Sequence, residues 1–300
     1  MAILTYENCR LCPRECGADR LRGKTGFCGM PAAPVLGLAA PHFWEEPCIS
    51  GEKGTGAVFF SGCSLGCPYC QNQRLTTERA GAEVTPSRLR EIFFELIEKG
   101  VTSIDLVNPT HFLPSVLEAL EQPLPVPVIY NCGGYEKAEN IRLLEGKVDV
   151  YLPDLKYADS KLADSLSHTP DYFAKATDAI REMYRQTGDY VLDENGFIRR
   201  GVIIRHLVLP DQLDNTFDVI DWLVETFKPG SVLFSLMGQY MPAGDLEKYP
   251  WLQRRLSAEE YQRAEDYLLT LGWEDGYFQE LESSSEQFLP DFDLSGVIKE

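Results

Sequence analysis

Short apolar runs, rich in β-branched and aromatic residues, alternate with longer amphipathic stretches from about residue 56 to residue 271. This alternation is typical of repeated βα units that build a parallel sheet. The runs themselves are almost continuously apolar, as strands are when both faces of a sheet are covered. Six strands are therefore predicted, over residues 57–62, 103–108, 127–131, 148–155, 202–209 and 232–237.

Four stretches between these runs have apolar residues at helical spacing, which predicts helices over 86–99, 173–185, 215–227 and 258–271. Six βα units are two short of a full eight-stranded barrel. The predicted fold class is therefore α/β, a partial (β/α)6 TIM-like barrel that is open on one side, with a small N-terminal four-cysteine metal module.

Composition divides the chain into three parts. Residues 1–35 are rich in Cys, Gly and Arg and hold too few apolar residues to fold without a metal. Residues 36–271 carry the barrel pattern, and residues 272–300 form a strongly acidic tail that is predicted to be a solvated surface segment.

The formal net charge is -18, which makes nucleic acid an improbable partner because such binding depends on Lys and Arg at phosphates. No stretch has the length of apolar sequence that a membrane span needs, and the first residues lack the pattern of a secretion signal. We therefore expect a soluble, cytoplasmic protein that binds neither nucleic acid nor membrane.

Three cysteines follow the first predicted strand directly, in the spacing Cys63-x3-Cys67-x2-Cys70. A 4Fe-4S cluster ordinarily takes four cysteines, so three local ligands leave one iron open. An open iron can bind S-adenosylmethionine and reduce its sulfonium, which releases a 5'-deoxyadenosyl radical. The alternative is a zinc knuckle or an electron-transfer cluster completed by Cys48 or Cys132.

At this point the chain resembles a known group, the radical S-adenosylmethionine (SAM) superfamily, and within it uncharacterised proteins related to pyruvate formate-lyase activating enzyme that carry an N-terminal four-cysteine module. The likeness runs from residue 9 to residue 240. It rests on the stretches CRLCPRECGADRLRGKTGFCG, HFWEEPCISG, FFSGCSLGCPYCQN, VNPTHF, YNCGGY, VYLPDLKY, RHLVLP and LMGQY.

The resemblance implies roles for individual residues. Tyr69 is similar to the aromatic residue that lies against the adenine of the cofactor. Asp154 and Lys156 match an Asp-x-Lys motif whose lysine neighbours the cofactor, and Arg205 matches an arginine that binds its carboxylate, a role that suits a bidentate guanidinium. Where activating enzymes carry a Gly-Gly-Glu segment, this chain departs from the pattern, and its oxygen acceptors there are Asn108 and Thr110.

The resemblance also implies an activity, that of a radical SAM oxidoreductase which generates a glycyl radical on a partner protein. Such a reaction needs an electron donor such as flavodoxin or ferredoxin. Two alternatives stay open: a radical SAM enzyme that modifies a small molecule or peptide directly, and a non-catalytic iron-sulfur or zinc protein that carries electrons or serves as a scaffold.

A second group of cysteines, Cys9, Cys12, Cys16 and Cys28, offers four thiolates that close a coordination sphere. Zinc and a second 4Fe-4S cluster both suit such a site. The remaining candidates are Cys132, as a hydrogen-atom donor or a buried thiol, and His42 and His111 near the substrate. Trp44, Glu45 and Glu46 are candidates to cap the open side of the barrel.

Overall fold

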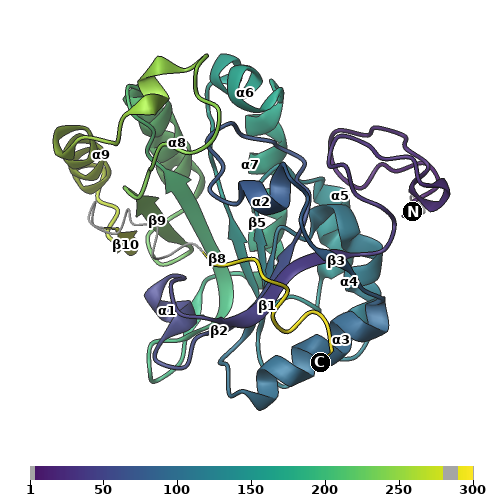
Figure 1. Cartoon of the computed structure of the whole chain (residues 1–300). Helices are drawn as coiled ribbons and strands as arrows, with labels where there is room; N and C mark the ends of the chain where they lie inside the picture. The colour runs from purple at the N-terminus through teal and green to yellow at the C-terminus, as the bar shows by residue number, and fades with distance from the viewer. Residues whose placement is uncertain (1–3, 280–289, 300) are drawn as a thin grey trace.

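The computed structural model describes residues 4–279 and 290–299, and its centre is one large sheet wrapped by helices (Figure 1). Six parallel strands lie side by side in chain order, which confirms the predicted partial barrel. They are β2 (Thr55–Phe60), β4 (Ile104–Val107), β5 (Val128–Cys132), β6 (Val150–Pro153), β8 (Ile198–Leu207) and β9 (Leu233–Met237).

Helices follow these strands and cover the outside of the sheet. The four predicted helices are α3 (Pro86–Glu98), α7 (Tyr172–Thr187), α8 (Leu213–Thr226) and α9 (Ala258–Thr270). Shorter helices are α1 (Pro47–Ser50), α2 (Gln73–Thr76), α4 (Leu113–Ala119), α5 (Ala138–Ile141) and α6 (Ser160–Ser167). Single turns of 3-10 helix are η1 (Arg20–Arg22), η2 (Thr110–Phe112), η3 (Arg142–Leu144) and η4 (Pro250–Gln253). None of the helices in the described part of the chain could cross a membrane.

Four further strands extend the sheet beyond the six that the pattern predicts. Strand β1 (Val35–His42) pairs antiparallel with β2, and β3 (Ala82–Glu83) pairs with β1. Strand β7 (Val191–Leu192) is antiparallel to β8, whereas β10 (Gly276–Phe278) continues the parallel order beyond β9. The edge next to β2 is thus covered by a returning strand instead of another βα unit.

The barrel interior is built in two layers, because every second residue of each strand points inward. The lower layer is apolar, and Cys48 and Ile49 of α1 pack into it against Ile129, Leu152 and Ile203. Two residues further along the chain from Ile129, Leu152, Ile203 and Leu233, the inward positions become polar. This upper layer contains Asn131, Asp154, Arg205 and Ser235, and Asp105 of β4, which pairs with Ile129, accepts a hydrogen bond from Asn131 at 3.3 Å.

The C-terminal segment differs from the solvated tail that composition predicts. Residues 276–278 form β10, and residues 290–299, here called the C-terminal strap, run along β1 (Figure 1). Backbone bonds join Leu294 to Gly37 and Ala39 to Ser295, at 3.0 and 2.9 Å. Phe292 is 5% exposed and packs edge-on against Phe59. The acidic residues between 280 and 289 lie outside the described residues.

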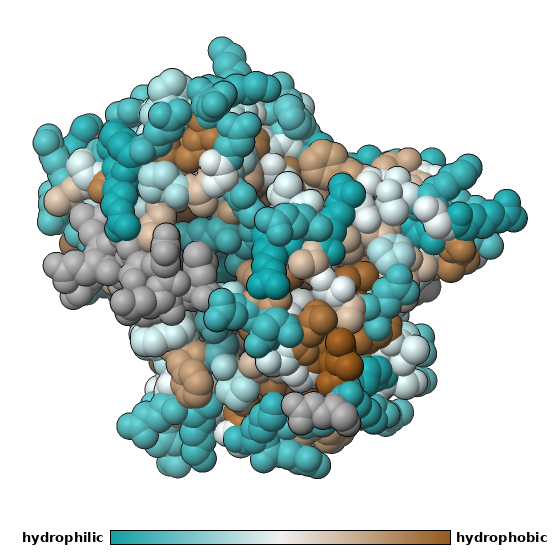
Figure 2. All heavy atoms as spheres, viewed as in Figure 1, coloured by the Kyte–Doolittle hydropathy of each residue, from teal (hydrophilic) through white to brown (hydrophobic). Residues whose placement is uncertain are grey.

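Hydrophilic side chains cover much of the face shown in Figure 2, in keeping with the net charge of -18. The N-terminal module forms a lobe at one side of the barrel, and its own backbone contains one short 3-10 turn (Figure 1). The fold of the module therefore depends on contacts between loops and side chains. Its contacts with the cysteine loop affect the geometry of the site.

Candidate active site

The cysteine triad lies on the loop that leaves the carboxyl end of β2, and all three side chains line one pocket at the barrel rim. Gly62 precedes the loop with a φ of +80°, and a Cβ there would lie 2.3 Å from the Met30 side chain. Only glycine fits at this position, because the N-terminal module packs directly against the start of the loop.

Each triad sulfur lies within hydrogen-bond distance of a donor in the fold. The backbone N–H of Leu65 donates to Cys63 at 3.3 Å, the Tyr157 hydroxyl to Cys67 at 3.4 Å, and the Thr76 hydroxyl to Cys70 at 3.4 Å. Hydrogen bonds to sulfur are among the means by which proteins tune iron-sulfur clusters. The loop thus offers three thiols whose orientation is set by neighbouring groups.

The three thiols of the triad suit an iron-sulfur cluster as a donor set. Burial raises the pKa of Cys63 to about 12, and the neighbouring Cys67 and Cys70 thiolates raise it further. Three thiolates in this place therefore need a positive centre between them. Within residues 4–279 and 290–299, no three Cys, His, Asp or Glu side chains are arranged around one ion. A 4Fe-4S cluster would take one of these thiolates on each of three irons.

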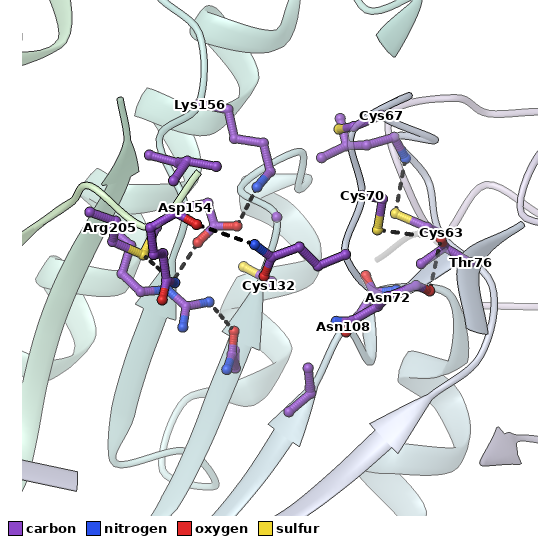
Figure 3. A pocket seen from close by; sticks show the side chains of 18 of the residues that line it. Cys63, Cys67, Cys70, Asn72, Thr76, Asn108, Cys132, Asp154, Lys156 and Arg205 are labelled. Carbon is purple, nitrogen blue, oxygen red and sulfur yellow. Dashed lines mark hydrogen bonds and ion pairs between the residues drawn. The ribbon is translucent and has the colours of Figure 1, made fainter. Parts of the chain in front are cut away.

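Asp154, Lys156 and Arg205 face the triad across the pocket (Figure 3). Asp154 accepts from the Lys156 ammonium at 2.5 Å and from Arg205 Nε at 2.9 Å. Burial alone would raise the pKa of Asp154, but Lys156 and Arg205 outweigh it and lower the pKa. Asp154 is therefore an ionised carboxylate that holds both cations at the rim.

Arg205 uses its donors within the protein. Besides Asp154, it donates to Glu45 Oε2 at 3.0 Å and to Asn131 Oδ1 at 2.6 Å. These bonds use three of the five N–H donors of the guanidinium, so the role that resemblance gives to Arg205, binding a cofactor carboxylate, is compatible with them. Lys156 has one carboxylate partner, and its ammonium can also bind an anion.

Two other predicted cofactor residues lie on the pocket wall. Tyr69 is buried, and its hydroxyl is 2.7 Å from that of Tyr157. Asn108 has a φ of +61° and donates from its side-chain amide to the Gly62 carbonyl at 2.6 Å. Both therefore support the cysteine loop as well as line the pocket.

Thr110 and His111 do not line this pocket. The Thr110 hydroxyl donates to the buried Glu136, and the His111 ring lies 2.6 Å from the Ser61 carbonyl. The expectations that Thr110 offers a cofactor contact and that His111 lies near the substrate therefore differ from the structure. Both residues begin the turn η2, which leads the chain away from the rim into α4.

The candidate capping segment does reach the pocket. His42, Trp44, Glu45 and Glu46 all line it, and Glu45 bonds to Arg205 of β8. Several other lining residues were given no role at the sequence level. Gln71, Asn72, Met237 and Gln239 lie within the quoted stretches, whereas nothing in the sequence singled out Thr76, Met241 and Gln279.

The four thiols of the N-terminal module lie near one another. Burial raises the pKa of Cys12 to about 12, with further increases from Cys28 and Cys9. Gly26 lies against Cys16, since a Cβ there would be 2.2 Å from its sulfur. The sulfurs are not arranged around one ion in the described part of the chain. A second metal centre here is therefore a proposal that the donor set allows.

Arg14 joins the module to the cysteine loop. Its guanidinium donates to the carbonyls of Ser64 at 2.8 Å and His168 at 2.7 Å, and also to that of Ser167. The ring of Phe27 stacks on it at 3.8 Å. The Ser167 hydroxyl in turn lies 3.2 Å from the Cys67 sulfur. Through these contacts one side chain of the module, Arg14, stabilises the cysteine loop.

Residues 49–122 match the family of 4Fe-4S single cluster domains, and this range contains the whole cysteine triad. This match supports a 4Fe-4S cluster at the triad, and the radical SAM assignment stays a prediction. The chain is also 27% identical over 270 residues to an uncharacterised protein from Methanocaldococcus jannaschii, a match that covers 86% of this chain and 73% of that protein.

Solved structures with a similar arrangement include SuiB from Streptococcus suis, at 15% identity and a TM-score of 0.48, covering 76% of this chain. The chain spans about half the length of SuiB, 50%. Methylornithine synthase has 14% identity and a TM-score of 0.46, covering 75% of this chain and 70% of that one. QueE from Escherichia coli has 11% identity and a TM-score of 0.43, covering 84% and 96%.

Proposed function

We propose that this chain is an enzyme that cleaves S-adenosylmethionine reductively at a 4Fe-4S cluster held by Cys63, Cys67 and Cys70. The observation that carries the proposal is the rim pocket, where three thiols of one loop face an ion-paired lysine and arginine. When bound, the cluster and S-adenosylmethionine would supply a 5'-deoxyadenosyl radical for hydrogen-atom abstraction.

The other cysteines support an open iron. Cys48 packs into the lower apolar layer, away from the rim. Cys132 lies on the pocket wall at the end of β5, outside the cysteine loop. We propose that neither of these cysteines completes the cluster, so that one iron stays open.

The chain's own residues would bind and orient the cofactor. Lys156 offers an ammonium to a carboxylate, and Asp154 keeps that ammonium charged, because burial lowers the pKa of Lys156 but Asp154 raises it by more. Tyr69 offers an aromatic ring beside the triad. Leu65 and Met237 add apolar side chains to the wall of the same pocket. An apolar wall helps to exclude water from a reactive species.

We further propose that the substrate is a glycine of a partner protein, as in the activating enzymes whose motifs this chain resembles. The cluster would be reduced by a flavodoxin or ferredoxin. This finer proposal is tested by co-purification: a protein with an Arg-Val-x-Gly-Tyr type loop should be retained and should acquire a glycyl radical signal in electron paramagnetic resonance.

The general proposal is tested by anaerobic reconstitution with iron and sulfide, followed by dithionite and S-adenosylmethionine. We expect 5'-deoxyadenosine and methionine from the native chain and none from Cys63→Ala, since two thiolates cannot hold the cluster. Cys48→Ala is the matched control, because it removes a buried thiol outside the pocket. Product formation by Cys63→Ala at the native rate would refute the proposal.

A further inference from the structure

The rim pocket has a second end, away from the cysteine loop, where β9 and β10 meet the segment before α1. Glu46 lies here, 4% exposed, and lines the pocket. Its Oε2 atom has no hydrogen-bond partner among residues 4–279 and 290–299. A buried carboxylate oxygen without a donor is costly, typically by about 1–3 kcal/mol.

Two more buried atoms at this end also lack a partner within the same residues, Ser235 Oγ and Gln279 Oε1. The strand register brings them together with Glu46. Tyr277 of β10 pairs with Ser235 of β9, and Gln279 follows Tyr277 on the same face of the strand. Glu46 lies near Tyr277, and the Ser235 hydroxyl lies close enough to its carboxyl group to lower the pKa of Glu46, but in a geometry that misses a hydrogen bond.

Charge at this end is also unbalanced. Arg205 pairs with Glu45 and Asp154, and Lys156 pairs with Asp154. Glu46 is left without a cation in contact, although the field of Arg205 reaches it. Burial raises the pKa of Glu46 to about 7, Arg205 opposes this rise, and Glu45 adds to it. A bound cation with several N–H donors would neutralise the unpaired charge of Glu46 and would donate hydrogen bonds to the unpartnered oxygens.

From this geometry we infer that the end of the pocket formed by Glu46, Ser235 and Gln279 binds a primary ammonium group of the substrate. An ammonium has three N–H donors and one positive charge. The three donors match Glu46 Oε2, Ser235 Oγ and Gln279 Oε1, and the charge matches the Glu46 carboxylate. Trp44 lines the same pocket and gives an aromatic wall of the kind that favours cations. The inference rests on the proposed function for its substrate, but the binding itself is independent of cofactor cleavage.

The test uses the full reconstituted chain and n-butylammonium as the probe, with 1-butanol as its uncharged analogue. Saturation-transfer NMR should show saturable binding of n-butylammonium and much weaker binding of 1-butanol. Glu46→Gln should weaken binding at least tenfold, and Gln279→Ala should weaken it several-fold. Glu52→Gln, an exposed acid beside α1, should leave it unchanged.

Circular dichroism melting separates a binding defect from a folding defect, and Gln279→Ala keeps the test open if Glu46→Gln fails to fold. Equal binding of the amine and the alcohol would overturn the inference. So would a tenfold loss of S-adenosylmethionine affinity in Glu46→Gln, because the ammonium would then be the cofactor's own. Loss of cofactor cleavage in the native chain would refute the proposed function while leaving the amine titration intact.

Discussion

Glu136 is a buried carboxylic acid whose partners are the hydroxyls of Thr110 and, at 3.5 Å, Tyr130. Burial raises its pKa to about 8, and the two hydroxyls offset this rise only in part. The folded chain therefore holds a proton that the unfolded chain releases above pH 4.5. This contribution to stability is complete below pH 4.5 and is lost as the pH rises to about 8.

Glu136→Gln should remove that pH dependence. The amide keeps an acceptor for both hydroxyls and carries no charge, so the variant should gain up to about 3 kcal/mol over the native chain at pH 9 and little at pH 4.5. Urea unfolding of reconstituted protein at the two pH values measures the difference. Glu121→Gln, at an exposed position, is the control, and equal gains at both pH values would contradict the assignment.

Arg205 forms ion pairs with two carboxylates, so its removal should lower the free energy of unfolding, whatever its effect on catalysis. Arg205→Ala leaves Glu45 and Asp154 without this partner inside the barrel, and we expect a loss of about 3–5 kcal/mol in the free energy of unfolding. Arg199 of the same strand pairs with Asp193 but is 50% exposed, and Arg199→Ala should cost less than about 1 kcal/mol. Comparable losses would show that the rim network is not a buried one.

At the scale of elements, Arg14 lets the N-terminal module order the cysteine loop. Arg14→Ala removes donors from the carbonyls of Ser64, Ser167 and His168, and the loop should then open more often. We expect faster amide exchange over residues 64–66 and faster loss of iron to a chelator. Arg10→Ala in the same module is the control, because the Arg10 side chain is 61% exposed and its ion pair, at 3.9 Å, is with Glu15 of the same module.

The six parallel strands and four long helices could be predicted because each is a long run with a clear period. Strand β1 could not, since Gly37 and Pro41 interrupt its apolar run and its partner runs antiparallel. Strand β10 has three residues, too few to form a pattern. The fold beyond the βα units thus depends on pairing between distant segments.

Some parts of the candidate site could likewise be predicted from the sequence, and others could not. Spacing alone locates the triad, because its three ligands lie on one loop. The Glu45–Arg205 ion pair joins residues 160 positions apart, and the unpartnered oxygens of Ser235 and Gln279 become visible only when β10 is placed beside β9. The family resemblance assigned Thr110 to the cofactor because of its position in the sequence. In the structure, the turn η2 directs the Thr110 hydroxyl to Glu136 instead.

At the scale of the whole molecule, the C-terminal strap forms part of the pocket wall, because Pro290 lines the pocket and Phe292 packs on another lining residue. Phe292 packs on Phe59, a lining residue of β2, with ring centroids 5.4 Å apart. Phe292→Ala should cost about 3 kcal/mol of stability. Ile298→Ala, in the same segment but 57% exposed, should cost less than about 0.5 kcal/mol. Equal melting temperatures for the two variants would show that the strap does not support the barrel.

The position of the strap also has a consequence for the order of events during synthesis. A growing chain folds from its N-terminus, so β1, β2 and the cysteine loop leave the ribosome long before residues 290–299. Until those residues arrive, Phe59 and the outer edge of β1 lack their last covering layer. We expect newly made chains to take up iron and sulfide only after release, so that ribosome-bound chains arrested before residue 290 carry empty triads.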